Sequence, residues 1–198
     1  MNIEPVHVYF DFIDPLSYLL ARELKVVLGG RNSGDSSDSV EVRWTPFELR
    51  PPPTPLTTSD DPTLAARWDQ ARALEVEAGS WFRPGQLVPW TRKAHELLLH
   101  AATADLQDAV RMAVFDCWLL EGRDIGRVDV LVELARNVGL DITETKAVLD
   151  VDRFEADVAA ARAAALSNSV TDTPVLVRGD RRLEGFHNRT ALGTFLGT

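Results

Sequence analysis

Near the N-terminus, an apolar run passes directly into a segment with helical spacing. Residues 7–12, HVYFDF, are rich in aromatic side chains and predict a buried strand. Pro15 can open a helix, and apolar residues recur at helical spacing from there to Leu28. Residues 40–44, VEVRW, then alternate like a second strand. A strand, a helix and a strand in this order predict a parallel βαβ unit with a right-handed crossover.

Two irregular segments flank the second strand. Residues 29–39 are rich in glycine, serine and aspartate, which predicts a solvated loop. Residues 51–62 contain prolines that do not fit a helix or a central strand, so we expect a linker or an extended surface loop.

The remainder of the chain consists of a long helical stretch and a short β-rich end. Residues 63–168 have helical spacing almost throughout, and the later predicted helices span 91–106, 106–120, 128–138, 142–149 and 153–166. Residues 173–178 and 182–184 then predict an antiparallel hairpin, and Asn188 is expected to cap a last helix that ends at Leu196. The predicted order is therefore βαβ, helices, ββα.

Composition and charge exclude several classes of function. A formal net charge of −9 repels a phosphate backbone, so we expect no nucleic-acid partner. No apolar run is long enough for a membrane span and the N-terminus lacks the basic start of a signal peptide, which predicts a cytoplasmic protein with no membrane partner. Four scattered histidines and the single Cys117 give no zinc-ligand spacing, so we expect no metal.

Six stretches, taken in order, resemble the DsbA family and its cytoplasmic FrnE-like branch. They are Phe10 to Tyr18, Trp44 to Leu49, Thr91 to His95, Glu121 to Gly126, Gly139 to Asp141, and Thr173 to Val175 followed by Gly185. The first stretch is also similar to 2-hydroxychromene-2-carboxylate isomerases and kappa-class glutathione transferases. The resemblance implies an α/β thioredoxin-like fold in which an all-helical domain is inserted. Residues 1–62 plus 169–198 would form the thioredoxin-like domain, and 63–168 the insertion, its last helix partly packed on the sheet.

The resemblance also shows which chemistry the chain lacks. The family places a Cys-x-x-Cys pair, or a catalytic serine in the isomerases, at the start of the first helix. Asp14 stands at the first of these positions and Ser17 at the second. Without sulfur there, a disulfide cannot be attacked, and Cys117 is expected to be a buried packing residue on an apolar helix face.

Asp14 has two interpretations. An aspartate before a proline is a favourable helix cap, and its side chain can accept from the amide of residue 16 or 17. Were it catalytic, Asp14 would act as a general base in a proton-transfer isomerisation, with Ser17 as a hydrogen-bond donor.

Several further residues are candidates for ligand binding. Thr173 and Pro174 resemble the cis-proline segment whose exposed backbone binds a peptide or glutathione main chain in the family. Asn188 and Arg189 are similar to the segment that holds the γ-glutamyl end of glutathione in kappa-class transferases. These residues predict a small-molecule or peptide ligand, with glutathione left open as a cofactor.

Aromatic and histidine side chains near the domain junction are also candidates. Trp44 and Trp90 could line a groove between the thioredoxin-like unit and the insertion. His95 lies on an apolar helix face, so it is either a core or interdomain histidine or an acid or base in the cleft, whereas His100 lies on the polar face and is expected to be solvated.

Three functions remain open, and with them whether the chain is an enzyme. One is a DsbA-family homologue that has lost dithiol redox chemistry and binds a peptide or small thiol ligand. The second is a glutathione-dependent isomerase or transferase. The third is a non-catalytic interaction or holdase module. It could be a homodimer and would use the inserted helices as its contact face.

Overall fold

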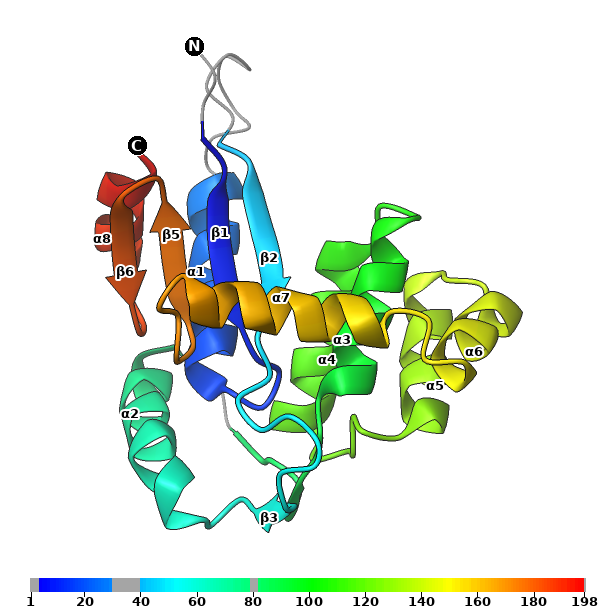
Figure 1. The fold of residues 1–198 in the computed structure, drawn as a ribbon. Coiled ribbons are helices and arrows are strands. Elements are labelled where there is room, and N and C mark those ends of the chain that lie inside the picture. Colours follow the sequence, from blue (N-terminus) through cyan, green and yellow to red (C-terminus); the bar gives the residue numbers. More distant parts are fainter. Residues whose placement is uncertain (1–3, 30–39, 79–81, 198) are drawn as a thin grey trace.

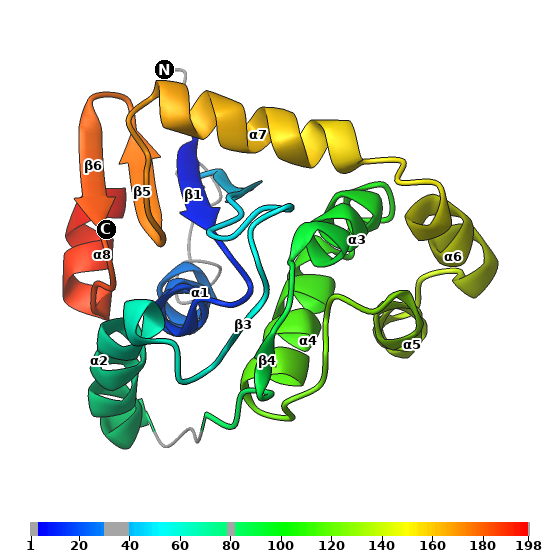
Figure 2. The same cartoon turned by 60° about the horizontal axis from the view of Figure 1, so that its bottom comes forward.

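A four-stranded sheet covered by helices on both faces organises the N- and C-terminal parts of the chain. The computed structural model describes residues 4–29, 40–78 and 82–197 (Figure 1). The sheet contains β1 (Val6–Phe10), β2 (Val42–Pro46), β5 (Val175–Arg178) and β6 (Arg181–Glu184). Its helices are α1 (Pro15–Gly29) and α8 (Arg189–Leu196) on one face and α7 (Glu155–Ser167) across the other (Figure 2).

The strand order of this sheet is β2-β1-β5-β6. β1 pairs parallel with β2, and Val8 lies opposite Trp44, which confirms the predicted βαβ unit. β1 also pairs antiparallel with β5, and Val8 lies opposite Leu176 on that side. The hairpin of β5 and β6 is antiparallel, as the sequence predicts. This mixed sheet with its ββα end is the topology that the thioredoxin-like fold implies.

Four helices form a bundle beside the β2 edge of the sheet (Figures 1 and 2). They are α3 (Arg92–Ala102), α4 (Gln107–Leu119), α5 (Val128–Val138) and α6 (Ile142–Asp150). Four of the predicted helices therefore exist. Their ends lie within two residues of those expected, except that α3 ends at Ala102, four residues before the expected end. The core of the bundle is continuous with the end of β1 through Phe10 and Phe12, whose rings contact Phe115 of α4.

Each face of the sheet has its own apolar core. Val6, Val8 and Leu176 pack against α1 and α8 on one face. Tyr9 and Val175 pack on the other face with Ala165 of α7. Side chains alternate between the two faces of a strand, so neighbouring residues of β1 pack into different cores.

Helix α2 (Pro62–Ala78) does not belong to the bundle. It lies beside α1, away from α3 to α6 (Figure 2). Its Trp68 is buried and packs on Phe82, which in turn contacts Tyr18 of α1. The predicted insertion 63–168 is therefore divided in space, with its first helix next to the thioredoxin-like helix α1.

Two other expectations differ from the structure, and a third is not tested by it. The predicted linker 51–62 contains β3 (Thr57–Thr58), which pairs antiparallel with β4 (Leu87–Val88). The two segments therefore form a small second sheet. The expectation that His100 is solvated is wrong, because α3 packs against α4, α5, α6 and α7 and its polar face is covered. The predicted loop 29–39 lies almost entirely outside the described residues.

Within the described ranges, none of the helices combines the length and apolar character needed to cross a membrane.

Candidate functional site

Asp14 ends the connection between β1 and α1 and caps the helix. Its Oδ1 accepts a hydrogen bond from the amide of Leu16 at 3.1 Å, and its Oδ2 accepts one from the amide of Ser17 at 3.1 Å. Pro15 occupies the first helical position, where its missing N–H would have no partner in the helix. The capping interpretation of Asp14 is therefore confirmed.

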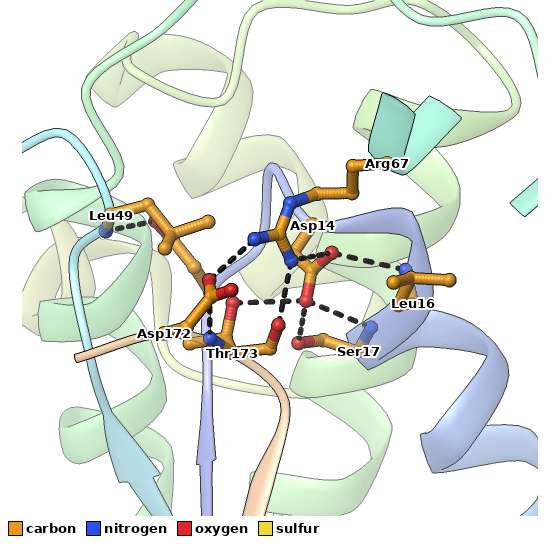
Figure 3. Close-up of polar contacts among 8 residues, drawn as sticks. Asp14, Leu16, Ser17, Leu49, Arg67, Asp172 and Thr173 are labelled. Carbon is orange, nitrogen blue, oxygen red and sulfur yellow. Dashed lines mark hydrogen bonds and ion pairs between the residues drawn. The ribbon is translucent and has the colours of Figure 1, made fainter. Parts of the chain in front are cut away.

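The same carboxylate accepts hydrogen bonds from two hydroxyl groups, one on α1 and the other just before β5 (Figure 3). Ser17 Oγ donates to Asp14 Oδ2 at 2.5 Å, and Thr173 Oγ1 donates to the same oxygen at 2.9 Å. Asp14, Ser17 and Thr173 are all buried. The Thr173–Pro174 peptide bond is cis, as the resemblance implies. The structure thus brings these three predicted residues and Pro174 together at the N-terminus of α1.

Arg67, on α2, completes the site (Figure 3). Its Nη1 donates to Asp14 Oδ1 at 3.0 Å and to the carbonyl oxygen of Thr173 at 2.6 Å. Its Nη2 donates to Asp172, which also accepts a bond from the amide of Thr173 at 2.8 Å. Sequence reasoning missed both Arg67 and Asp172, since no motif marks an arginine that reaches its partners from a separate helix.

Burial and pairing act in opposite directions on the charges of this site. Burial raises the pKa of Asp14, although the Arg67 charge and the hydrogen bonds from Ser17 and Thr173 act to lower it. Burial acts to lower the pKa of Arg67, but the charges of Asp14 and Asp172 outweigh it and raise that pKa. The carboxyl group therefore depends on Arg67 for much of the stabilisation of its charged form.

A cleft of about 320 Å³ opens next to this network. It is lined by Leu16 of α1, by one side of α2 that includes Ala66 and Gln70, by residues 171–175 and by the end of β6. Thr173 and Pro174 reach its wall, as does Arg67. Asp14 and Ser17 lie behind that wall, because neither side chain is exposed.

His95 belongs to a second buried polar group, at the junction of the sheet and the bundle. Its Nε2 lies 3.2 Å from Asp11 Oδ1, and Asp11 Oδ2 accepts from the amide of Leu49 at 2.7 Å. Both side chains are fully buried, and His95 also contacts the rings of Phe10 and Phe12. His95 is therefore an interdomain core histidine, and it does not line the cleft.

The two tryptophans also lie away from the cleft wall. The guanidinium of Arg111 stacks over the ring of Trp44 at 4.0 Å, and Trp44 packs edge-on against Phe10. Trp90 donates from Nε1 to the carbonyl oxygen of Thr54 at 2.9 Å and remains partly exposed. Both rings serve as contacts between chain segments in this structure.

Asn188 and Arg189 lie at the start of α8, shortly after the end of β6. Asn188 caps α8, because its Oδ1 accepts from the amide of Ala191 at 3.0 Å. Arg189 forms an ion pair with Glu23 of α1 at 2.8 Å. Neither residue lines the cleft whose wall Thr173 reaches.

Cys117 is enclosed in the bundle core. Its side chain is fully buried, and burial raises the pKa of its thiol to about 11. A thiol in this environment is a packing residue, as the sequence predicts.

Comparisons with known proteins agree with this architecture. An uncharacterized protein of Bacillus subtilis, YwbO, is 29% identical over 188 residues, which cover 91% of this chain and 89% of that protein. A probable DsbA oxidoreductase from Streptomyces coelicolor is similar in structure, with a TM-score of 0.78 and 23% identity over 98% of this chain and 90% of its own. The structure of a 2-hydroxychromene-2-carboxylate isomerase is similar with a TM-score of 0.76 and 17% identity, over 97% and 94% of the two chains.

The match to a described family covers nearly the whole chain. The DSBA-like thioredoxin domain corresponds to residues 5–195 and thus includes the sheet, α2 and the inserted bundle. The chain therefore belongs to the DSBA-like thioredoxin domain family.

Proposed function

We propose that this protein is a DsbA-family member without dithiol redox activity that binds a peptide or a small thiol ligand in the cleft beside Pro174. The observation that carries the proposal is the environment of Asp14. The amides that stabilise a thiolate at the start of α1 in a dithiol enzyme donate here to a carboxylate of the same chain. The place of the reactive sulfur is therefore taken by an internal, non-redox group.

No other group of the chain supplies the missing sulfur chemistry. The thiolate is the nucleophile in disulfide exchange, and a thiol with a pKa of about 11 is almost entirely protonated at neutral pH. Cys117 is also enclosed in the bundle core, away from the cleft. We therefore expect no reduction or isomerisation of disulfides.

The ligand part of the proposal is supported by the cleft itself. Its volume of about 320 Å³ lies at the lower end of the usual range for small-molecule sites. Gln70, Thr171 and Glu184 provide polar groups along its wall next to Leu16 and Pro174. Glutathione is one ligand to test, and neither a metal nor another cofactor is required.

A glutathione-dependent isomerisation is less well supported by the site. Such an enzyme needs a donor for the glutathione thiolate, and both the hydroxyl and the amide of Ser17 already donate to Asp14. A thiolate about 4 Å from a carboxylate would be disfavoured by about 4 kcal/mol at an effective dielectric constant of about 20. A catalytic role of Asp14 or Ser17 and the holdase alternative with its homodimer stay predictions, as does the cytoplasmic location.

Two measurements test the proposal. The first is insulin reduction with excess dithiothreitol, in which the protein should not exceed the rate of the reductant alone. The second is calorimetry with glutathione and with short unrelated peptides, in which at least one ligand should bind. Reduction above the background would contradict the loss of redox activity, and a lack of binding by every ligand would contradict the binding function.

A pair of variants locates any binding that is found. Ala66 of α2 lines the cleft, whereas its exposed neighbour Ala65 does not. Ala66→Trp should fill the cleft and abolish binding, and Ala65→Trp should leave the affinity unchanged. Equal affinity in both variants would place the ligand elsewhere.

A further inference from the structure

The main-chain groups of Thr173 are occupied by side chains of the same protein. Its carbonyl oxygen accepts from Arg67 Nη1 at 2.6 Å, and its amide donates to Asp172 at 2.8 Å. Arg67 also donates to Asp172, so one guanidinium joins both sides of this short segment (Figure 3). A ligand whose main chain pairs with Thr173 in strand fashion needs these groups and meets Arg67 first.

We propose that Arg67 is a proton-coupled gate on the cleft: it closes the main-chain edge at Thr173, and when it leaves, Asp14 takes up a proton. This inference rests on the proposed function, since it concerns how a ligand would reach the same cleft. The gate exchanges hydrogen bonds and transfers one proton from solvent to the Asp14 carboxylate, and it makes no covalent bond to the ligand.

The coupling follows from what Arg67 leaves behind. Asp14 has no exposed side-chain surface, and Arg67 is its only cationic partner among the described residues. A buried carboxylate that loses its counterion is strongly destabilised, and protonation is the usual response. Burial already raises the pKa of Asp14 with Arg67 in place, so removal of the guanidinium moves it further in the same direction.

The side chain of Arg67 can move into solvent, whereas the side chain of Asp14 is enclosed. Arg67 retains 17% of its side-chain surface exposed and projects from α2 along the cleft wall. Its second carboxylate partner, Asp172, is 62% exposed and can be solvated without Arg67. Most of the free-energy cost of moving Arg67 away therefore comes from the loss of the counterion of Asp14.

The other charged groups near Asp14 do not replace Arg67. The carboxylate of Asp11 is directed to Leu49 and His95. Arg182 and Glu184, which line the cleft, form an ion pair with each other at 2.7 Å. Ser17 and Thr173 contribute hydroxyl groups that can donate to a carboxylate or accept from a carboxylic acid.

The gate is tested without a ligand, by NMR of the guanidinium protons of Arg67. Their exchange with water is compared with that of Arg72, which lies exposed on the same helix and corrects for the intrinsic effect of pH. The ratio of the two rates should rise by up to about tenfold for each pH unit of acidification, because opening binds one proton. A ratio that does not change between about pH 7 and about pH 5 would overturn the proposal.

Two variants distinguish Asp14 from Asp172 as the group that binds the proton. Asp14→Asn should make the exchange ratio independent of pH, whereas Asp172→Asn should raise the ratio and keep its pH dependence. The opposite pattern would assign the proton to Asp172 and refute the coupling to Asp14. If Asp14→Asn does not fold, Asp172→Asn alone still decides, because loss of the pH dependence there is incompatible with the proposal.

Binding experiments separate this inference from the proposed function. If a peptide binds the cleft, Arg67→Ala should bind it at least several-fold more tightly than the wild type at neutral pH, and Arg72→Ala should not. Equal affinity in Arg67→Ala and the wild type would overturn the gate. If no ligand binds any variant, the proposed function fails, while the guanidinium exchange still decides whether the gate exists.

Discussion

Replacing Asp14 by alanine should destabilise the protein at the start of α1. The substitution removes the acceptor of two helix amides and of the buried hydroxyls of Ser17 and Thr173. It also leaves Arg67 with only the Thr173 carbonyl oxygen and Asp172 as partners. Every one of these losses occurs at or behind the wall of the cleft.

The size of the effect can be worked out from these contacts. Loss of a helix cap costs about 1 kcal/mol. Each buried hydroxyl that is left without its acceptor costs about 1 kcal/mol at the lower end of the range. Removing a buried carboxylate offsets part of this loss, so we expect the free energy of unfolding to fall by about 2–3 kcal/mol. For a chain of this length, the midpoint temperature should fall by about 4–12 °C.

Asp14→Asn is the matched control. An asparagine can still accept from the helix amides, and its amide group can donate to the two hydroxyls, so we expect a loss below about 1 kcal/mol. Because the pKa of Asp14 is raised in the folded state, its contribution to stability is fully present below its ordinary value and is lost as the pH rises through the raised pKa. The stability of Asp14→Asn relative to the wild type should therefore improve as the pH rises above about 4.

Urea unfolding followed by circular dichroism, repeated over a range of pH, measures both effects. Two results would refute the reasoning. One is an Asp14→Ala variant within about 0.5 kcal/mol of the wild type, which would mean that the network does not stabilise the fold. The other is an equal loss in the alanine and asparagine variants, which would mean that the charge and not the hydrogen bonding of Asp14 matters.

Three further predictions concern other parts of the structure. Cys117 should react with a thiol reagent in the native protein only at the rate of unfolding, because it is buried and its pKa is raised to about 11; reaction as fast as that of a free thiol would contradict its placement. His95→Leu should lower the free energy of unfolding by about 1–3 kcal/mol, because the buried Asp11 loses a partner, and an unchanged urea midpoint would argue against that contact. Arg189→Ala should change it by less than about 1 kcal/mol, since the Arg189 side chain is 61% exposed, and a larger loss in the same assay would show a role beyond the pair with Glu23.

Much of the fold could be predicted because its strongest features are local. Asp14 and Pro15 are adjacent in sequence and form a cap and a first helical turn, so their role follows from short-range geometry. Apolar spacing within single elements likewise gave the parallel strand pair and the bundle helices. The cis bond before Pro174 followed from the resemblance of a short segment.

The features that the sequence did not predict depend on contacts between distant segments. Arg67 lies 53 residues from Asp14 and 106 from Thr173, and nothing in the pattern of α2 indicates which way its side chain points. His100 lies on the polar face of its helix, but neighbouring helices cover that face and the residue is buried. Helical spacing shows which residues share a face, and it does not show what packs against that face.

The contact of Arg67 with Thr173 has a consequence for how this chain can be divided. A minimal thioredoxin-like fragment cut before α2 would keep Asp14 and lose its counterion. Such a fragment would uncover the side of α1 that packs against α2, and it would leave the buried carboxylate of Asp14 without its cationic partner. The chain should therefore be divided after α2. A dissected or circularly permuted version should keep that helix with the sheet.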